Sequence, residues 1–347
     1  MRYLLLSLLL LLTSCFKEPL YHSQSYVFGT LVDISIYGET DEHARQLVDH
    51  ILQDFQNLHN RLHAWKPISA SQLSELGKLN AAFQASKQAT ISPDLARILA
   101  DATALSVKSK GLFNPSIGHL IGTWGFQRDE FNPIAVDDKS IQALIKAKPA
   151  MTDIVVQGNL AYSNNSAVKL DLGGYAKGYA LDIAAAYLRQ QQVKNALINI
   201  GGNITALGQH GDKPWRVGIQ HPRSPTAIAT LELTDGWSIG TSGDYQRYFM
   251  LNGKRYCHII DPRTGYPAQH TQAVTVLVPP GKNSGALSDV ASKPIFLETP
   301  DNRSKTAHAF GIDHFMVIDA QSKIFVSKKL AKKLHWVEAG VKFTTLP

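Results

Sequence analysis

The sequence predicts an α+β fold with mixed or antiparallel sheets flanked by helices, formed by one domain. Long amphipathic helical patterns lie in the first third of the chain, whereas short strand patterns dominate its second half. No long polar linker interrupts the interior of the 347 residues. The regular alternation of strands and helices that would indicate a doubly wound parallel sheet is missing from the second half.

The composition is that of a globular protein with a sizeable core. Hydrophobic residues make up 44% of the chain and charged residues 18%, which excludes disorder, collagen-like repetition and a disulfide-dense miniprotein. The net charge of +7 suits anionic ligands or surfaces. The basic residues cluster only at Lys328, Lys329, Lys332 and Lys333, with the spacing of a solvated helix face. We therefore expect no nucleic-acid partner.

Residues 1–14 have the pattern of a secretion signal. Arg2 precedes a leucine-rich run over residues 4–12, which is well short of the roughly 20 residues that span a bilayer. Leu12-Thr13-Ser14-Cys15 resembles a bacterial lipobox, so Cys15 is the expected lipidation site. Ordinary secretion with cleavage nearby is the alternative. Residues 15–25 are expected to form a polar tether, and residues 26–347 the folded domain.

The first half of that domain is expected to contain one strand and two long helices. Residues 26–37 alternate apolar and polar side chains, which indicates a strand. Residues 41–62 place apolar side chains at helical spacing. A second helix is expected to begin at Ser92-Pro93, where serine suits the cap and proline the first turn, and to end near Lys110-Gly111.

The second half is expected to consist mainly of strands around one clear helix at residues 175–189. A short helix is also expected around Asp289. The expected extended segments are 167–172, 195–200, 216–220, 227–233, 256–260, 273–278, 315–319 and 323–326.

The segment LDLGGYAKGYALD at residues 170–182 carries the strongest chemical signal. An extended segment ends at Asp171, two glycines follow, and a helix begins with Lys177 in its first turn. Backbone amides and the positive end of the helix then face one place, where an anion could bind. The glycine spacing excludes a Walker loop and a dinucleotide fingerprint. The alternative is a tight turn with a solvent-facing lysine.

Three other segments are chemically suggestive but ambiguous. INIGGN at residues 198–203 ends a strand in two glycines, and YCHIIDPRTGYP at residues 256–267 contains a histidine near an aspartate. From spacing alone, a histidine bonded to a backbone carbonyl is preferred to a catalytic one. Asp289 could hold Mg²⁺ or pair with Lys293 four residues later, and spacing alone favours the ion pair.

Taken together, these segments closely resemble the ApbE family of FAD:protein FMN transferases. The resemblance spans nearly the whole mature chain and implies an ApbE-like, T-fold-related α+β fold with FAD in a cleft. It further implies transfer of FMN from FAD to a threonine or serine hydroxyl of another protein, with release of AMP. The matching blocks are FGTLVDISIYG (28–38), GLFNPSIGHLIGTWGF (111–126), LDLGGYAKGYALD (170–182), INIGGN (198–203), TSGDY (241–245), HIIDPRTGYP (258–267) and SDVASKPIF (288–296).

The resemblance also implies roles for individual residues. His258 matches the base for the target hydroxyl, and Asp289 matches a catalytic carboxylate that is also the main ligand of Mg²⁺. Gly174 matches a position whose carbonyl ligates the same ion. The implied FAD contacts are Phe28, Trp65, Leu112, Phe113, Asn114, Asp171, Lys177 and Ile260.

One departure from the family pattern affects the metal site. Lys293 stands where the family usually has a threonine ligand, and an ammonium competes with a divalent cation for Asp289. Pro294 is expected to kink the helix at this point. Two hypotheses follow from this departure. In the first, Lys293 supplies part of the metal's charge and transfer survives with altered Mg²⁺ dependence. In the second, the chain is an FAD-binding lipoprotein or an FAD pyrophosphatase with weak or no transfer. A third alternative is a scaffold lipoprotein without ligand.

The expected location follows from the leader and the resemblance. A lipid anchor at Cys15 would hold the protein on a membrane of the bacterial envelope, facing the periplasm. Phe16, in place of an acidic residue, favours the outer over the inner membrane. The expected acceptors are exported, threonine- or serine-bearing domains of respiratory redox proteins.

Overall fold

The computed structural model describes residues 19–67, 72–128 and 130–346. The expected signal sequence and Cys15 lie outside the described residues. Within them, no helix has the length and apolarity needed to cross a membrane.

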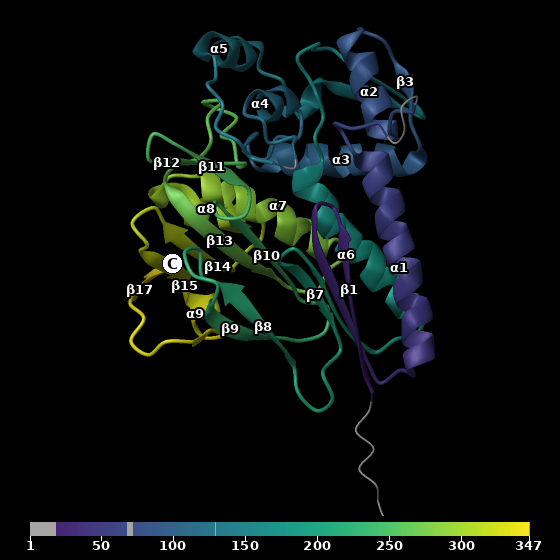
Figure 1. Cartoon of the computed structure of the whole chain (residues 1–347), viewed down its shortest axis with the longest axis vertical. Coiled ribbons are helices and arrows are strands. Elements are labelled where there is room, and N and C mark those ends of the chain that lie inside the picture. The colour runs from purple at the N-terminus through teal and green to yellow at the C-terminus, as the bar shows by residue number, and fades with distance from the viewer. Residues whose placement is uncertain (1–18, 68–71, 129, 347) are drawn as a thin grey trace, which may run out of the picture.

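A nine-stranded sheet forms the centre of the molecule (Figure 1). Neighbouring strands run antiparallel except for the last pair, which is parallel, so the sheet is mixed. The α+β prediction is confirmed. In spatial order the strands are β1 (Leu20–Val27), β2 (Thr30–Tyr37), β6 (Asn195–Ile200), β7 (Asn203–Leu207), β10 (Ser238–Gly243), β13 (Thr271–Val278), β14 (His314–Asp319), β15 (Ile324–Ser327) and β17 (Phe343–Leu346).

Helices cover one face of this sheet and a smaller sheet covers the other. The helical face carries α1 (Asp41–Leu62), α6 (Gly173–Gln190) and α7 (Ser284–Leu297), whose apolar side chains join those of the sheet in the larger core. The second core lies between the opposite face and β8 (Trp215–Gln220), β9 (Ala227–Leu233), β16 (His335–Trp336) and α9 (Lys328–Ala331).

The remaining elements gather mainly at one end of the molecule, above α7 in Figure 1. A third apolar cluster packs here around Trp124 and Phe249. These elements are α2 (Glu75–Gln84), β3 (Ala89–Thr90), α3 (Pro93–Lys108), α4 (Gly118–Thr123), α5 (Asp138–Ala147), η1 (Met151–Asp153), β4 (Ile154–Gln157), β5 (Leu160–Ser163), β11 (Tyr248–Leu251) and β12 (Lys254–Cys257). Helices η2 (Pro300–Asn302) and α8 (Arg303–Ala309) follow α7.

Local sequence explains α1, whose bounds agree with the prediction. Thr40 caps the first turn by accepting a hydrogen bond from the amide of His43, and Asp41 and Glu42 complement the positive end of the helix. A continuous stripe of buried side chains then faces the sheet and α6. Strands β6 and β9 also have the predicted bounds.

Two predictions near the N-terminus are wrong. Residues 20–25, assigned to the tether, belong to β1, which pairs with β2 along its whole length. The polar alternation of this segment is that of an edge strand with one solvated face. The single strand predicted for residues 26–37 is a hairpin instead, because Phe28 and Gly29 both adopt positive φ and form a two-residue turn.

Two predictions in the second half also need correction. The extended segment expected at residues 167–172 forms one isolated bridge, from Lys169 to Ile117, rather than a strand. Helix α6 begins at Gly173, two residues before the predicted start. Pro294 lies inside α7, which continues to Leu297; the kink expected at this proline stays a prediction.

Candidate functional site

The glycine pair at residues 173 and 174 begins α6, as the anion-site hypothesis requires. No side chain caps the preceding Leu172 position, and Gly173 is exposed. The Asp171 carboxylate accepts a hydrogen bond from the Gly173 amide at 2.8 Å. Lys177 lies one turn further, with Nζ 3.5 Å from the Gly173 carbonyl oxygen. A helix N-terminus and a flexible cation thus meet at one place.

Asp171 also fixes a tryptophan beside this helix end. Its Oδ2 accepts a 2.6 Å hydrogen bond from Nε1 of Trp65. The Lys169 ammonium lies over the indole ring, 4.0 Å from its centre, and makes a cation–π contact with it. Trp65 is half-buried, so part of the indole remains exposed near the N-terminus of α6.

Asp289 comes from α7 and is almost completely buried against α6. Its Oδ2 accepts a hydrogen bond from the Gly178 amide at 3.1 Å. The close approach of α7 to α6 requires a glycine at position 178, because a Cβ there would lie 2.4 Å from the Gly285 carbonyl oxygen. Asp182 of α6 accepts hydrogen bonds from the amides of Gly285 and Ala286 and so holds the start of α7.

Lys293 binds the same carboxylate. Its Nζ donates to Oδ1 of Asp289 at 2.6 Å and to the Asp289 carbonyl oxygen at 2.7 Å. The i,i+4 ion pair favoured from spacing is therefore present. The lysine stem passes Gly174 so closely that a Cβ there would lie 2.9 Å from Cε of Lys293.

The charges of this cluster shift the pKa of Asp289 and Lys293. Burial favours the neutral acid at Asp289, but Lys177, Lys293 and the Gly178 amide outweigh it, so the pKa of Asp289 is lowered. Burial lowers the pKa of Lys293, while Asp289 opposes this shift. The charges of two lysines thus stabilise the ionised form of Asp289.

His258 follows β12, and the charges of the same two lysines act on it. Its backbone amide and its Nδ1 both contact the Arg247 carbonyl oxygen, at 3.0 and 3.3 Å. A carbonyl oxygen only accepts, so Nδ1 carries the proton and the lone pair of the neutral ring lies on Nε2. Burial, Arg247, Lys177 and Lys293 lower the pKa of His258, which keeps the imidazole neutral.

The neighbouring aspartate does not orient this histidine. Asp261 accepts hydrogen bonds from Arg263, and Arg263 also donates to the Leu297 carbonyl oxygen at the end of α7. The turn after His258 thus holds the C-terminal end of α7. The Arg247 carbonyl takes the orienting role. A bond from this histidine to a backbone carbonyl is the preferred expectation from spacing, although the sequence did not indicate which carbonyl.

The other predicted FAD contacts lie in different surroundings. Phe28 packs beside Phe55 of α1 at the hairpin turn. Leu112 and Phe113 are buried in the larger core, with the Phe113 ring 3.7 Å from the place of a Cβ on Gly174. Asn114 bonds to the Pro149 carbonyl and Ser116, and Ile260 is buried in the third cluster. Their contacts with FAD stay predictions.

Sequence reasoning missed three residues that build the site. Gly178 admits Asp289, Arg247 orients His258, and Lys169 covers Trp65. The glycine inside the helical segment AKGYALD was a readable signal of close helix packing. The contact of Lys169 with Trp65 joins segments that are distant in the sequence, and that of Arg247 with His258 has no recognisable spacing.

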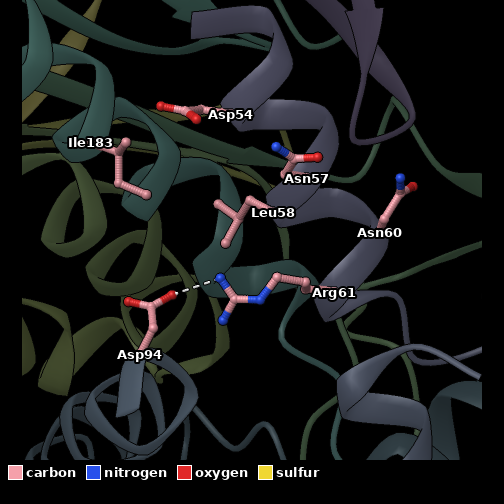
Figure 2. Close-up of a pocket in the computed structure, with 7 residues that line it drawn as sticks. All are labelled: Asp54, Asn57, Leu58, Asn60, Arg61, Asp94 and Ile183. Carbon is pink, nitrogen blue, oxygen red and sulfur yellow. Dashed lines mark ion pairs between the residues drawn. The ribbon is translucent and has the colours of Figure 1, made fainter. Parts of the chain in front are cut away.

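A separate cavity of about 550 Å³ lies between α1, α3 and α6 (Figure 2). Arg61 and Asp94 form an ion pair across it at 3.1 Å. Its lining contains none of the predicted site residues: it consists of Asp54, Asn57, Leu58, Asn60, Arg61, Asp94 and Ile183. We therefore assign the candidate site to the charged residues of α6 and α7 and not to this cavity.

The described residues do not fit the Mg²⁺ ion that the resemblance implies. Both Asp289 oxygens already accept hydrogen bonds, from Lys293 and from the Gly178 amide. The Lys293 stem occupies the space beside Gly174, and protonated lysine cannot ligate a metal. No group of three His, Cys, Asp or Glu side chains suited to a metal occurs in the described ranges.

Comparison with known proteins agrees with the sequence resemblance. The model of the ApbE family matches residues 28–316. A FAD:protein FMN transferase of Rhodobacter capsulatus is 36% identical over 91% of this chain, which covers 58% of that relative. One from Haemophilus influenzae is 30% identical over 80% of the chain and 82% of its own length.

Solved structures show the same fold. The ApbE protein of Thermotoga maritima superposes with a TM-score of 0.79 and 26% identity, covering 91% of this chain and 99% of its own. Flavin transferase ApbE of Vibrio cholerae gives a TM-score of 0.76 at 25% identity, with the same coverage. Sequence blocks, fold and relatives agree, and the chain belongs to the ApbE family.

Proposed function

We propose that the chain transfers FMN from FAD to a threonine or serine hydroxyl of another protein. The observation that carries this proposal is the convergence of a neutral, oriented His258 with Lys177 and Lys293 at the N-terminus of α6. Phosphoryl-type transfer requires mainly positioning and charge stabilisation, which these groups supply. The names of the relatives support the same reaction.

The proposed step balances without any redox partner. The acceptor hydroxyl oxygen bonds to the FMN phosphorus of FAD, and the bond from that phosphorus to the bridging oxygen breaks. AMP leaves with the electron pair of that bond. The hydroxyl proton passes to Nε2 of His258, which carries the lone pair of the neutral ring because Nδ1 is the protonated nitrogen. Lys177 and Lys293 offset the charge on the pyrophosphate oxygens.

The site has distinct regions for the parts of FAD. The Gly174 amide and Lys177 are suited to the pyrophosphate, whereas the amides of Gly173 and Tyr175 already donate to Asp171 and to the Leu172 carbonyl. Trp65, held by Asp171, offers a face for one of the two ring systems. Phe28, Leu112, Phe113, Asn114 and Ile260 remain predicted FAD contacts.

We further propose that the protein acts at the bacterial envelope. The leader and Cys15 support a lipid anchor facing the periplasm, with outer-membrane sorting favoured by Phe16. Such a location limits the acceptors to exported domains, and the class we propose is threonine- or serine-bearing domains of respiratory redox proteins.

Incubation with FAD and a purified acceptor domain of that class tests the proposal. We expect AMP release and a fluorescent acceptor band. The acceptor mass should increase by that of FMN less one water, because one hydroxyl is esterified by the FMN phosphate. The His258→Ala variant should bind FAD, as seen in a thermal shift, without labelling the acceptor.

Each alternative predicts a different result. Release of both free FMN and AMP without acceptor labelling identifies a pyrophosphatase. A thermal shift without cleavage of FAD identifies a binding lipoprotein. The absence of any thermal shift leaves the scaffold reading and contradicts the proposed function.

A further inference from the structure

The position of Lys293 suggests how the site handles a pyrophosphate without a resident metal. Its Nζ binds both a side-chain and a main-chain oxygen of Asp289, at 2.6 and 2.7 Å. Both atoms are acceptors, so the nitrogen must donate two of its three hydrogens. The ammonium therefore lies on the carboxylate that the resemblance assigns to Mg²⁺.

The surrounding backbone fixes the lysine in this position. Gly174 allows the stem to pass, because a Cβ there would lie 2.9 Å from Cε. Asp289 is itself held by the Gly178 amide from α6. The ammonium is thus fixed between the N-terminal turn of α6 and the middle of α7, where the proposed anion site lies.

The third hydrogen of Nζ is available to a substrate. No partner for it is present among the residues that the structure describes, and the Lys293 side chain is 18% exposed. Lys169, Lys177 and the Asp171 carboxylate also lie at this end of α6. With Lys293, three lysines outweigh the carboxylates of Asp171 and Asp289 and leave a net positive charge. A divalent cation approaching Asp289 would have to displace one ammonium and meet repulsion from both.

We propose that the Lys293 ammonium is a built-in cation that takes the place of a divalent metal and contacts the FAD pyrophosphate directly. This inference rests on the proposed function, because it concerns how the same site binds FAD. It predicts that FAD binding and FMN transfer proceed in the presence of a metal chelator. It also predicts that the free protein has no site for Mn²⁺, a paramagnetic probe of Mg²⁺ sites.

Two measurements on the full-length protein test this inference. Electron paramagnetic resonance of free Mn²⁺ reports metal binding without FAD, and flavin fluorescence titration reports FAD binding in EDTA or in Mg²⁺. The variants are Lys293→Met, which removes the charge, and Lys293→Thr, which replaces it with a potential metal ligand. Lys305→Met, at an exposed position of α8, is the matched control.

We expect wild-type protein to bind no Mn²⁺ and to have the same FAD affinity in both buffers, within twofold. Lys293→Met should weaken FAD binding at least tenfold in either buffer. Lys293→Thr should weaken it at least tenfold in EDTA, recover in Mg²⁺ and gain Mn²⁺ binding. Lys305→Met should match wild type. If Lys293→Met fails to fold, the wild-type measurements and the recovery of Lys293→Thr still decide the question.

Stoichiometric Mn²⁺ binding by wild type, or FAD binding that requires Mg²⁺, overturns the inference but leaves the proposed function intact. A Lys293→Met variant that binds FAD in EDTA as tightly as wild type also overturns the inference. Failure of the wild-type protein to bind FAD in either buffer contradicts the proposed function itself, and the inference with it.

Discussion

Hydrogen bonding at single residues determines the chemistry available in this site. The Arg247 carbonyl sets the tautomer of His258, and Asp171 ties Trp65 to the start of α6. Buried Asp289 forms an ion pair with part-buried Lys293, and both of its carboxylate oxygens accept a hydrogen bond. These hydrogen bonds therefore fix the orientation of each group for binding or transfer.

Removing the imidazole of His258 should abolish most of the transfer. Because general-base catalysis typically contributes about 10²–10⁴-fold, His258→Ala should reduce the rate of acceptor labelling by that order. FAD affinity should change little, since Lys177 and Lys293 remain. Stopped-time assays of AMP release, paired with FAD titration, separate the two effects. An unchanged labelling rate would contradict the assignment of His258 as base.

The pH dependence of transfer should reflect the lowered pKa of His258. An unperturbed imidazole would gain its proton near pH 6.5 and lose basic activity there. Because burial and the nearby cations lower the pKa of His258, the base stays neutral as the pH falls through that range. AMP release measured from pH 5.5 to 8.5 should therefore remain flat across pH 6.5. A half-maximal rate near pH 6.5 would show that the imidazole is unperturbed.

At the scale of elements, the contact between α6 and α7 positions the site. The backbones approach through Gly178 and Gly285, and α7 rests on β10 where Gly240 faces the Ser288 carbonyl. Asp182 holds the first turn of α7, and Arg263 holds its last carbonyl. Small shifts of α7 would therefore move Asp289 and Lys293 together.

Adding one methyl group at this crossing should destabilise the protein and weaken FAD binding. A Cβ at Gly178 would lie 2.4 Å from a backbone oxygen, so Gly178→Ala should cost about 1–3 kcal/mol in the free energy of unfolding. Urea unfolding of the variant measures this cost. Gly281→Ala, at a position without close contacts, is the control and should change stability by less than about 0.5 kcal/mol. Equal effects of the two substitutions would contradict the packing argument.

The sequence predicted elements well where one face is buried and one is solvated. Helix α1 and strand β9 show that periodicity and were located to the residue. Strand β7 is buried on both faces and has no alternation to read, and β10, SIGTSG, has the composition of a turn. Its glycine is explained by the approach of α7, which is a property of the tertiary structure.

At the scale of the whole molecule, the fold brings distant blocks to one place. Strand order puts β10 and β13 beneath α7, while α6 lies alongside it (Figure 1). Sequence motifs indicated most of the residues, and the i,i+4 pairing of Asp289 with Lys293 was readable from spacing. The contacts of Gly178 with Asp289 and of Arg247 with His258 were not, because helix crossings and loop carbonyls leave no periodic signal.

The proposed lipid anchor makes a prediction for the complete chain. Replacing Cys15 by serine removes the thiol that would carry the acyl groups, so the protein should move from the membrane to the soluble fraction. Cell fractionation with immunodetection compares Cys15→Ser with Cys257→Ser, which alters the buried thiol and should leave the distribution unchanged. Membrane retention of Cys15→Ser would contradict lipidation at this residue.

A crystal structure of the chain with bound FAD tests the central claim most directly. We predict that the pyrophosphate lies at the N-terminus of α6, within hydrogen-bond distance of Nζ of Lys177 and Lys293, with an FAD ring against Trp65. Nζ of Lys293 should remain on Asp289. FAD in the cavity between α1, α3 and α6, or a divalent metal between Asp289 and the phosphates, would contradict the account.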